Sequence, residues 1–263
     1  LVLVENGSSP PERDAIARAF SVHRAIIGDS WMYLPQEVNL GFSGGNNVGI
    51  RLFLDRPDIT HICLLNSDVI VPHHWLDRLA EKRLPILSGV TNKADSEQCV
   101  PVDYDVTLNG CLDAQTEILL PEIVDRVDAF AEERYRNFQG CTVETDITFF
   151  CVLIERETMA QLGLLDESFF PGGYEDNDYC LRARAAGVPP RLARDCFIHH
   201  WGSASFGQLQ HQYFSENARR NIRYLEDKHG VALERHPETP LVSYESDFCG
   251  RCSIMPTSPI CGA

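Results

Sequence analysis

The chain has 263 residues, of which 44% are hydrophobic and 23% are charged, as in a soluble globular protein with one large α/β domain or two small ones. Its formal net charge of −15 argues against a nucleic-acid-binding function, which needs clustered Lys and Arg, and against general attraction to an anionic membrane. No apolar run could span a bilayer and no signal peptide is visible, so we expect a cytoplasmic protein. Contact with the inner face of a membrane would require a local basic patch.

Apolar strands alternate with helical patterns along the first third of the chain. We expect strands at residues 1–5, 32–34, 61–65 and 86–90 and helices at residues 12–20, 48–55 and 72–81. Alternation of this kind indicates an α/β fold with a parallel, doubly wound sheet that helices flank on both faces. Ligands of such sheets bind beyond the carboxyl ends of the strands, where Glu5, the loop 39–47 and residues 66–68 fall. Three loops are therefore expected to converge on one crevice.

The rest of the chain starts irregularly and then returns to the alternation. Residues 100–108 could form an edge hairpin, and further strands are expected at residues 147–154 and 191–200. Further helices are expected at residues 122–135, 156–162 and 208–229, and one more ends at Gly187. We expect residues 1–230 to form one domain and residues 231–263, rich in Pro, Ser and Cys, to be a loosely ordered extension.

The segment 169–182 is the most informative about function. Glu175, Asp176 and Asp178 follow a turn that contains Gly172, Gly173 and aromatic residues. Glycine lets the backbone approach a ligand closely, aromatic faces suit a sugar ring, and a carboxylate there could act as a general base on a hydroxyl group. The alternative is an acidic helix start that only complements the helix dipole.

Two further segments carry metal-binding residue types. Asn66, Ser67 and Asp68 end a buried strand, where an Asp can hold a divalent cation and leave positions open for phosphate; the alternative is a turn stabilised by Asn or Asp. His199 and His200 end another strand, so their side chains point in opposite directions and one of them could complete a metal site. The alternative is a histidine packed at a strand end.

The loop 39–47 contains three glycines and three asparagines. Such a loop could wrap a nucleotide, with backbone amides near the helix start facing phosphate, or it could be an ordinary loop and helix cap. If the ligand carries phosphates, a divalent cation would offset their repulsion from this acidic chain.

Ten cysteines are scattered along the chain without a clear framework. Cys63, Cys151 and Cys180 lie in apolar or periodic stretches, where cysteine behaves as a small buried hydrophobe, and a reducing cytoplasm is the simplest environment for them. Cys249, Cys252 and Cys261 could hold zinc, although a second pair of ligands is missing.

Taken as a set, these segments resemble family 2 glycosyltransferases of the GT-A fold, near the rhamnosyltransferase-like members. The resemblance implies a Rossmann-like α/β domain with a mixed, mostly parallel sheet flanked by helices. The likeness covers residues 1 to about 230, and its motifs fall in the family's order. The matching segments are residues 4–8, 39–47 with Gly49, 64–68, 149–154, 162–170, 175–178, 200–205 and 213–225. Relative to the family, the chain begins at the second strand, without the early nucleoside-binding segment.

The resemblance implies an inverting transfer of a sugar from a nucleoside-diphosphate sugar, with UDP or dTDP favoured, to a hydroxyl group of a glycan or glycolipid. Such reactions serve cell wall or polysaccharide biosynthesis. Asp176 would be the catalytic base, and Mg²⁺ or Mn²⁺ would be held by Asp68 and His200 on the diphosphate. The acceptor would contact Glu175, Gly173 and Trp201. The donor would contact Glu5, Asn6, Asn39, Gly44, Asn47, Asn66, Ser67 and Asp68, where Asn66 opens a variant of the family's Asp-x-Asp motif.

Two other functions remain open at this stage. A non-catalytic sugar- or nucleotide-binding domain would use the same crevice, but it has no chemical need for Asp68, Asp176 and His200 together. A sugar nucleotidyltransferase would need a Gly- and Arg-rich phosphate loop after the first strand, and the residues after Glu5 do not form one.

Overall fold

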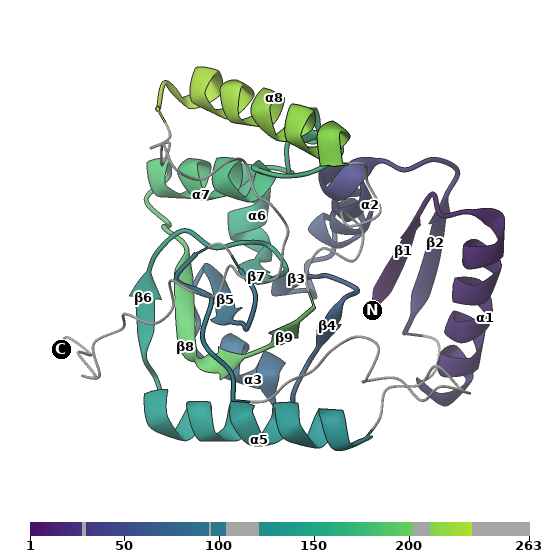
Figure 1. Ribbon diagram of the computed structural model, residues 1–263, viewed down its shortest axis with the longest axis vertical. Helices are drawn as coiled ribbons and strands as arrows, with labels where there is room; N and C mark the ends of the chain where they lie inside the picture. Colours follow the sequence, from purple (N-terminus) through teal and green to yellow (C-terminus); the bar gives the residue numbers. More distant parts are fainter. Residues whose placement is uncertain (28–29, 95, 104–120, 202–210, 233–263) are drawn as a thin grey trace.

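The central feature of the computed structural model is a five-stranded mixed sheet with helices on both sides (Figure 1). The structure describes residues 1–27, 30–94, 96–103, 121–201 and 211–232. The strands are β1 Val2–Asn6, β2 Met32–Gln36, β3 His61–Leu65, β4 Val69–Ile70, β5 Ile86–Val90, β6 Thr142–Glu144, β7 Cys151–Glu155, β8 Arg191–Phe197 and β9 His199–His200. The helices are α1 Pro10–Ile27, α2 Gly41–Leu54, α3 Trp75–Ala80, α5 Pro121–Phe138, α6 Arg156–Leu162, η1 Glu167–Phe169, α7 Glu175–Ala185 and α8 His211–His229.

The central sheet has the strand order β3-β7-β5-β8-β6. β5 and β8 are parallel, whereas β7 pairs antiparallel with both β3 and β5, and β6 pairs antiparallel with β8. β3, β5 and β8 therefore run in one direction and β7 and β6 in the other. The expected α/β fold with a mixed sheet flanked by helices is confirmed. The expectation that this sheet is mostly parallel is wrong, because three of its four strand pairs are antiparallel.

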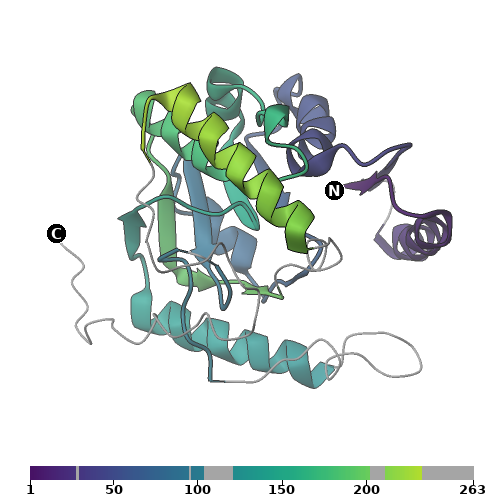
Figure 2. The ribbon, with the colours of Figure 1, turned by 45° about the horizontal axis from the view of Figure 1, so that its top comes forward.

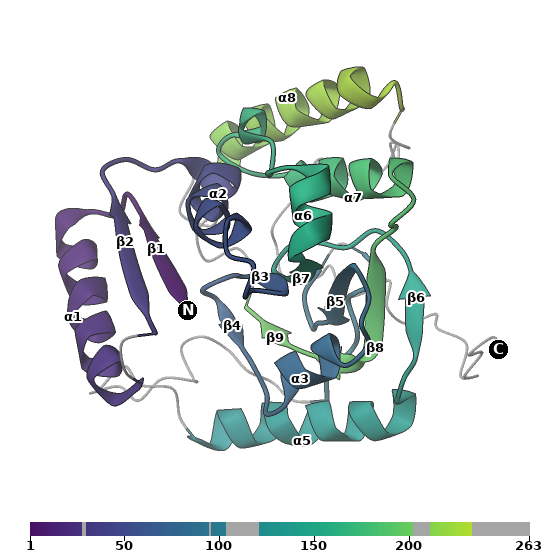
Figure 3. The same cartoon turned by 180° about the vertical axis from the view of Figure 1, so that it is seen from behind.

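Two smaller sheets complete the architecture. β1 and β2 form a parallel pair, and Phe20 of α1 packs on Tyr33 of β2 with ring centroids 5.4 Å apart. This β1–β2–α1 unit stands at one side of the central sheet (Figure 3). β4 and β9 form a short antiparallel pair that brings Val69 opposite His200. The ends of two strands that are far apart in sequence therefore lie side by side.

The inner strands β5 and β7 are largely apolar, as expected for strands that helices cover on both faces. All five residues of β5 are buried, as are the first four of β7. On one side α5 packs against β8, with Phe130 and Phe197 edge to face at 4.7 Å. On the other side α6 and α7 contribute Met159 and Tyr179 to the core, and α8 lies beyond them (Figures 1 and 2).

Several expected elements differ from the observed ones. The predicted loop 39–47 is wrong beyond its first two residues, because α2 begins at Gly41. Tertiary contacts override the low helix propensity of its glycines: the Phe42 N–H donates to Pro171 O, and a Cβ at Gly45 would lie 2.9 Å from Asn6 Nδ2. The strand expected at residues 147–154 begins only at Cys151.

The remaining expectations fall partly outside the described residues. The strand expected at residues 191–200 is divided into β8 and β9, with Ile198 between them. Residues 100–103 form no strand, and residues 104–108 of the predicted hairpin lie outside the described part, as do residues 233–263 with the three tail cysteines. Cys151 and Cys180 are buried as expected, whereas Cys63 is half-buried. Among the described residues, no helix combines the length and apolar character needed to cross a bilayer.

Candidate functional site

The first turn of α7 presents three carboxylates in three different environments. Glu175 is 6% exposed, and the buried atom Oε2 accepts no hydrogen bond from the described residues. Burial, with a smaller contribution from the charge of Asp176, raises the pKa of the Glu175 carboxyl to about 8, against the opposing effect of backbone hydrogen bonds from Glu175 and Gly173. Asp176 is only half-buried. Glu175 is therefore a neutral acid near pH 7, and Asp176 is the carboxylate nearer to solvent.

Asp178 is fully buried and belongs to an ion cluster. Its carboxylate lies 2.9 Å from Arg182 Nε, 2.6 Å from Lys228 Nζ and 2.8 Å from His229 Nε2. Because Lys228 and His229 come from α8, these pairs tie the last turn of α8 to α7. Asp178 therefore has a structural role, which distinguishes it from Glu175 and Asp176 in the same turn.

The turn before α7 is held by the side chain of Asn221, which the sequence did not single out. Asn221 is fully buried in α8, and its Nδ2 donates to Phe169 O at 2.9 Å, Gly172 O at 3.2 Å and Gly173 O at 3.0 Å. Its neighbour Arg220 donates to the carbonyl of Phe170 and to Asn221 Oδ1. These contacts fix the backbone that leads into Glu175.

Asp68 and His200 meet where β4 pairs with β9. Asp68 Oδ1 lies 3.3 Å from His200 Nε2, and both side chains are largely buried, with 15% and 14% of their surface exposed. His200 Nδ1 lies 3.1 Å from the carbonyl of Lys93, and the ring stacks on Phe150 at 5.1 Å. Because a carbonyl only accepts, Nδ1 donates to it, and the other ring nitrogen, Nε2, faces the Asp68 carboxylate.

Asp68 and His200 have donor atoms that suit two of the ligand positions of a divalent metal ion. No group of three or more His, Cys, Asp or Glu side chains gathers within the part of the chain that the structure describes. Mg²⁺ and similar ions commonly take only one or two carboxylates from the protein and complete their shell with water and substrate phosphates. The donor set of Asp68 and His200, with His200 Nε2 a buried atom that makes no hydrogen bond to described residues, suits such a site.

The residues next to this pair come from the same strand ends. The Trp201 N–H donates to Asp68 O at 2.9 Å, and its indole lies edge to face with His199 at 5.4 Å. The Asn66 N–H donates to Phe150 O at 2.8 Å, while Ser67 is exposed. The expected donor residues 66–68, His200 and the expected acceptor residue Trp201 are thus brought together.

A second group of expected residues gathers at the start of α2. Asn6, at the end of β1, donates through Nδ2 to Gly41 O at 3.0 Å and accepts from Leu40 N at 2.9 Å, and Asn39 Oδ1 accepts from Gly41 N at 2.8 Å. Gly44 is buried, and a Cβ there would lie 2.8 Å from Leu40 Cβ. Close packing at this turn therefore requires a residue without a side chain.

Glu5 and Asn47 are buried, and their side chains are engaged within the fold. Glu5 accepts from Ser8 N at 2.5 Å and lies 2.8 Å from Arg13 Nε. Asn47 donates to Leu165 O at 2.8 Å and accepts from Leu165 N at 3.0 Å. The Asn47 contacts join α2 to the segment that precedes α7.

The chain is similar to known glycosyltransferases in sequence and in fold. No protein-family model matches the chain. Over 188 residues the chain is 26% identical to the low-salt glycan biosynthesis hexosyltransferase Agl10 of Haloferax volcanii, an alignment that covers 71% of this chain and 54% of that protein. The chain thus spans about half the length of that relative.

A solved structure shows the same fold. The crystal structure of GalNAc-T7 with UDP, GalNAc and Mn²⁺ matches with a TM-score of 0.52 and 13% sequence identity, over 84% of this chain and 41% of that chain. The chain therefore has the GT-A fold of that glycosyltransferase.

Proposed function

We propose that the chain is a metal-dependent glycosyltransferase, which moves a hexose from a nucleoside-diphosphate sugar to a hydroxyl group of a glycan or glycolipid with inversion at the anomeric carbon. The observation that carries this proposal is the meeting of Asp68 and His200 at the paired ends of β4 and β9 in a GT-A fold. The similarity to the hexosyltransferase Agl10 supports the same reaction class.

The donor would bind between the end of β1, the start of α2 and residues 66–68. UDP is the first nucleotide to test, because the GalNAc-T7 structure contains UDP and Mn²⁺, and dTDP is the second. Asp68 and His200 would hold Mg²⁺ or Mn²⁺, which when bound neutralises charge on the leaving diphosphate. That compensation matters in a chain with a net charge of −15.

Asp176 would act as the general base that takes the proton from the acceptor hydroxyl. It is half-buried at the start of α7, whereas Asp178 is engaged with Arg182, Lys228 and His229. Glu175 is neutral near pH 7 because burial raises its pKa to about 8, so it would donate a hydrogen bond to the acceptor instead of taking its proton. Gly173 and Trp201 would line the acceptor side.

We further propose that residues 1–230 form a family 2 domain of the rhamnosyltransferase-like kind, in a pathway that builds a polysaccharide or glycolipid. Its place of action would be the cytoplasm or the inner face of a membrane. The motifs around Asp68, Asp176 and His200, in the family's order along the chain, support this assignment.

Donor binding provides the first test. Calorimetric titration of the chain with UDP-, dTDP- and GDP-sugars, with and without Mn²⁺, should detect binding of at least one donor that depends on the metal. Asp68→Ala should weaken this binding by about tenfold or more, because even the outer partners of metal ligands contribute at that scale. Asp125→Ala, which removes an exposed carboxylate from α5, is the matched control and should bind as the wild type does.

Transfer provides the second test. Asp176→Asn should keep donor binding and lower turnover by about a hundredfold or more, the usual effect of a general base. Binding of no donor under any condition would refute the transferase proposal. Donor binding without turnover in the wild type would favour the non-catalytic sugar- or nucleotide-binding domain, and turnover retained by Asp176→Asn would remove Asp176 from the role of base.

A further inference from the structure

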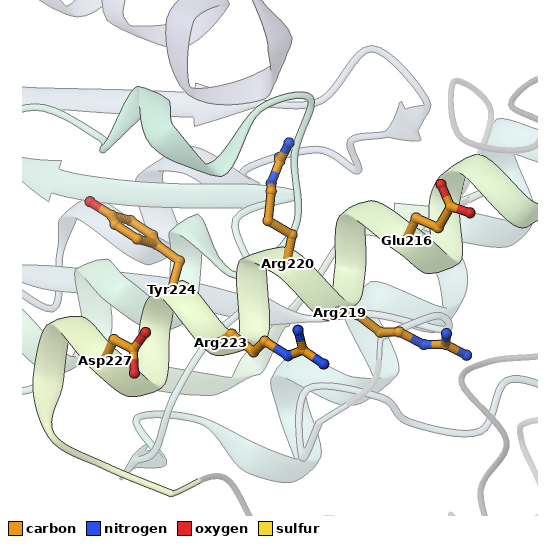
Figure 4. A pocket seen from close by; sticks show the side chains of 6 residues that line it. All are labelled: Glu216, Arg219, Arg220, Arg223, Tyr224 and Asp227. Carbon is orange, nitrogen blue, oxygen red and sulfur yellow. The ribbon is translucent and has the colours of Figure 1, made fainter.

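The outer side of α8 carries a cluster of arginines in a chain that is acidic overall. Arg219, Arg220 and Arg223 line a groove of about 440 Å³, shown in Figure 4, together with Tyr224 and with Glu216 and Asp227. The chain has 38 acidic residues against 23 basic ones, whereas this groove is lined by three basic and two acidic side chains.

Arg219 and Arg223 are exposed and point to the same side of the helix (Figure 4). Residues four positions apart lie one above the other on a helix, and like charges at this spacing repel each other. Neither guanidinium makes an ion pair with any residue that the structure describes. An anion that bound between them would relieve this repulsion.

Arg220 connects the groove to the candidate site. Its guanidinium points away from Arg219 and Arg223 and donates to the carbonyl of Phe170, in the turn that precedes Glu175 and Asp176. A ligand held by Arg219 and Arg223 would lie on a different side of α8 from this turn, and Arg220 is the residue that links the groove to the proposed acceptor side.

We propose that this groove binds a phosphate or diphosphate group of the glycosyl acceptor, an inference that rests on the proposed transferase function. The planar guanidinium group matches phosphate oxygens with two parallel hydrogen bonds, and two guanidinium groups can hold one phosphate from both sides. The phosphate belongs either to a lipid-linked acceptor or to a soluble sugar phosphate. Both sources share this chemistry, and the two arms of the experiment distinguish them.

The test compares three proteins: the wild type, the double variant Arg219→Gln/Arg223→Gln and the control Arg126→Gln/Arg136→Gln, which removes the same charge from exposed positions on α5. Binding of inorganic pyrophosphate is measured by calorimetry in EDTA, so that a metal-dependent donor site does not contribute. Co-sedimentation with phosphatidylcholine vesicles, with and without phosphatidic acid, forms the lipid arm. Equal thermal unfolding midpoints of the three proteins confirm that both variants fold.

We expect the α8 variant to lose roughly tenfold or more in affinity for pyrophosphate, for phosphatidic acid vesicles or for both, while the control stays within about twofold of the wild type. Loss in the soluble arm alone indicates a soluble sugar phosphate, and loss in the lipid arm indicates a lipid-linked one. Equal loss in both variants, or no binding of either probe by the wild type, would overturn the proposal.

Titration of the same proteins with UDP and Mn²⁺ separates this proposal from the function on which it rests. If the wild type binds UDP but neither phosphate probe, phosphate binding by the groove is refuted and the transferase function is not. A wild type that binds no nucleotide sugar refutes the transferase function, and with it the assignment of the groove to a glycosyl acceptor.

Discussion

Replacing Glu175 by glutamine should make the protein more stable, by an amount that depends on pH. The Glu175 side chain is buried at the start of α7, and burial raises its pKa to about 8, from 4.5 for an ordinary glutamate. A glutamine side chain at this position would have nearly the shape of the protonated acid but would not ionise. The variant therefore removes the cost of placing a charge there.

The sign and size of the effect follow from proton linkage. Below pH 4.5 the folded and unfolded states both hold the proton of Glu175, and the stability it contributes is fully present. As the pH rises the unfolded state releases its proton first, so this stability is lost until the pH reaches about 8. The gap between the two pKa values corresponds to roughly 5 kcal/mol as an upper bound, because each tenfold change in proton affinity is worth about 1.4 kcal/mol.

Urea unfolding of the wild type and of Glu175→Gln at about pH 5 and about pH 9 measures this difference directly. The free energy of unfolding of the wild type should fall relative to that of the variant by several kcal/mol over this range. Glu133→Gln, at an exposed position of α5, should show the pH dependence of the wild type. If Glu175→Gln also follows the wild type at every pH, Glu175 is not a neutral buried acid.

Three further predictions concern other contacts. Asn221→Asp replaces the amide that donates to three carbonyls and should lower the free energy of unfolding in urea by roughly 2–4 kcal/mol. The control Asn137→Asp, at an exposed position, should lower it by less than about 0.5 kcal/mol, and equal losses would show that the Asn221 hydrogen bonds do not stabilise the turn. Lys82→Ala leaves the buried Asp195 without its cation at 2.7 Å and should cost about 3–5 kcal/mol in the same assay, and a neutral effect would refute the importance of that pair. His200→Ala should weaken Mn²⁺-dependent nucleotide binding by about tenfold or more in calorimetry, and unchanged metal dependence would exclude His200 as a ligand.

The inner elements could be predicted from local patterns. The bounds of β3, β5 and α6 agree with the predicted bounds, because each is an apolar run or a periodic segment that ends at a clear change in pattern. The α/β class followed from the alternation of strands and helices. The antiparallel position of β7 between β3 and β5 could not be predicted in this way, because a buried strand has the same apolar sequence pattern whether its neighbours run parallel or antiparallel to it.

The start of α2 and the contacts of Asn221 could not be predicted, because both depend on distant residues. Gly41 begins a helix in a stretch rich in glycine only because residues 6, 39 and 171 supply its hydrogen bonds. Asn221 lies about fifty positions from the turn it holds, and an Asn in a polar helix shows no local sign that it is buried.

For the candidate site, the residue types and their order along the chain were sufficient to select the candidate carboxylates and His200 and to indicate a resemblance to glycosyltransferases. Only the tertiary structure assigned different environments to the three carboxylates of α7. Glu175, Asp176 and Asp178 have the same ionisable group, and their differences arise from their positions in the fold: Glu175 is buried, Asp176 is partly exposed, and Asp178 is paired with Arg182, Lys228 and His229. Burial and ion pairing depend on residues that are distant in sequence and close in space, so the four residues 175–178 could not by themselves predict these differences.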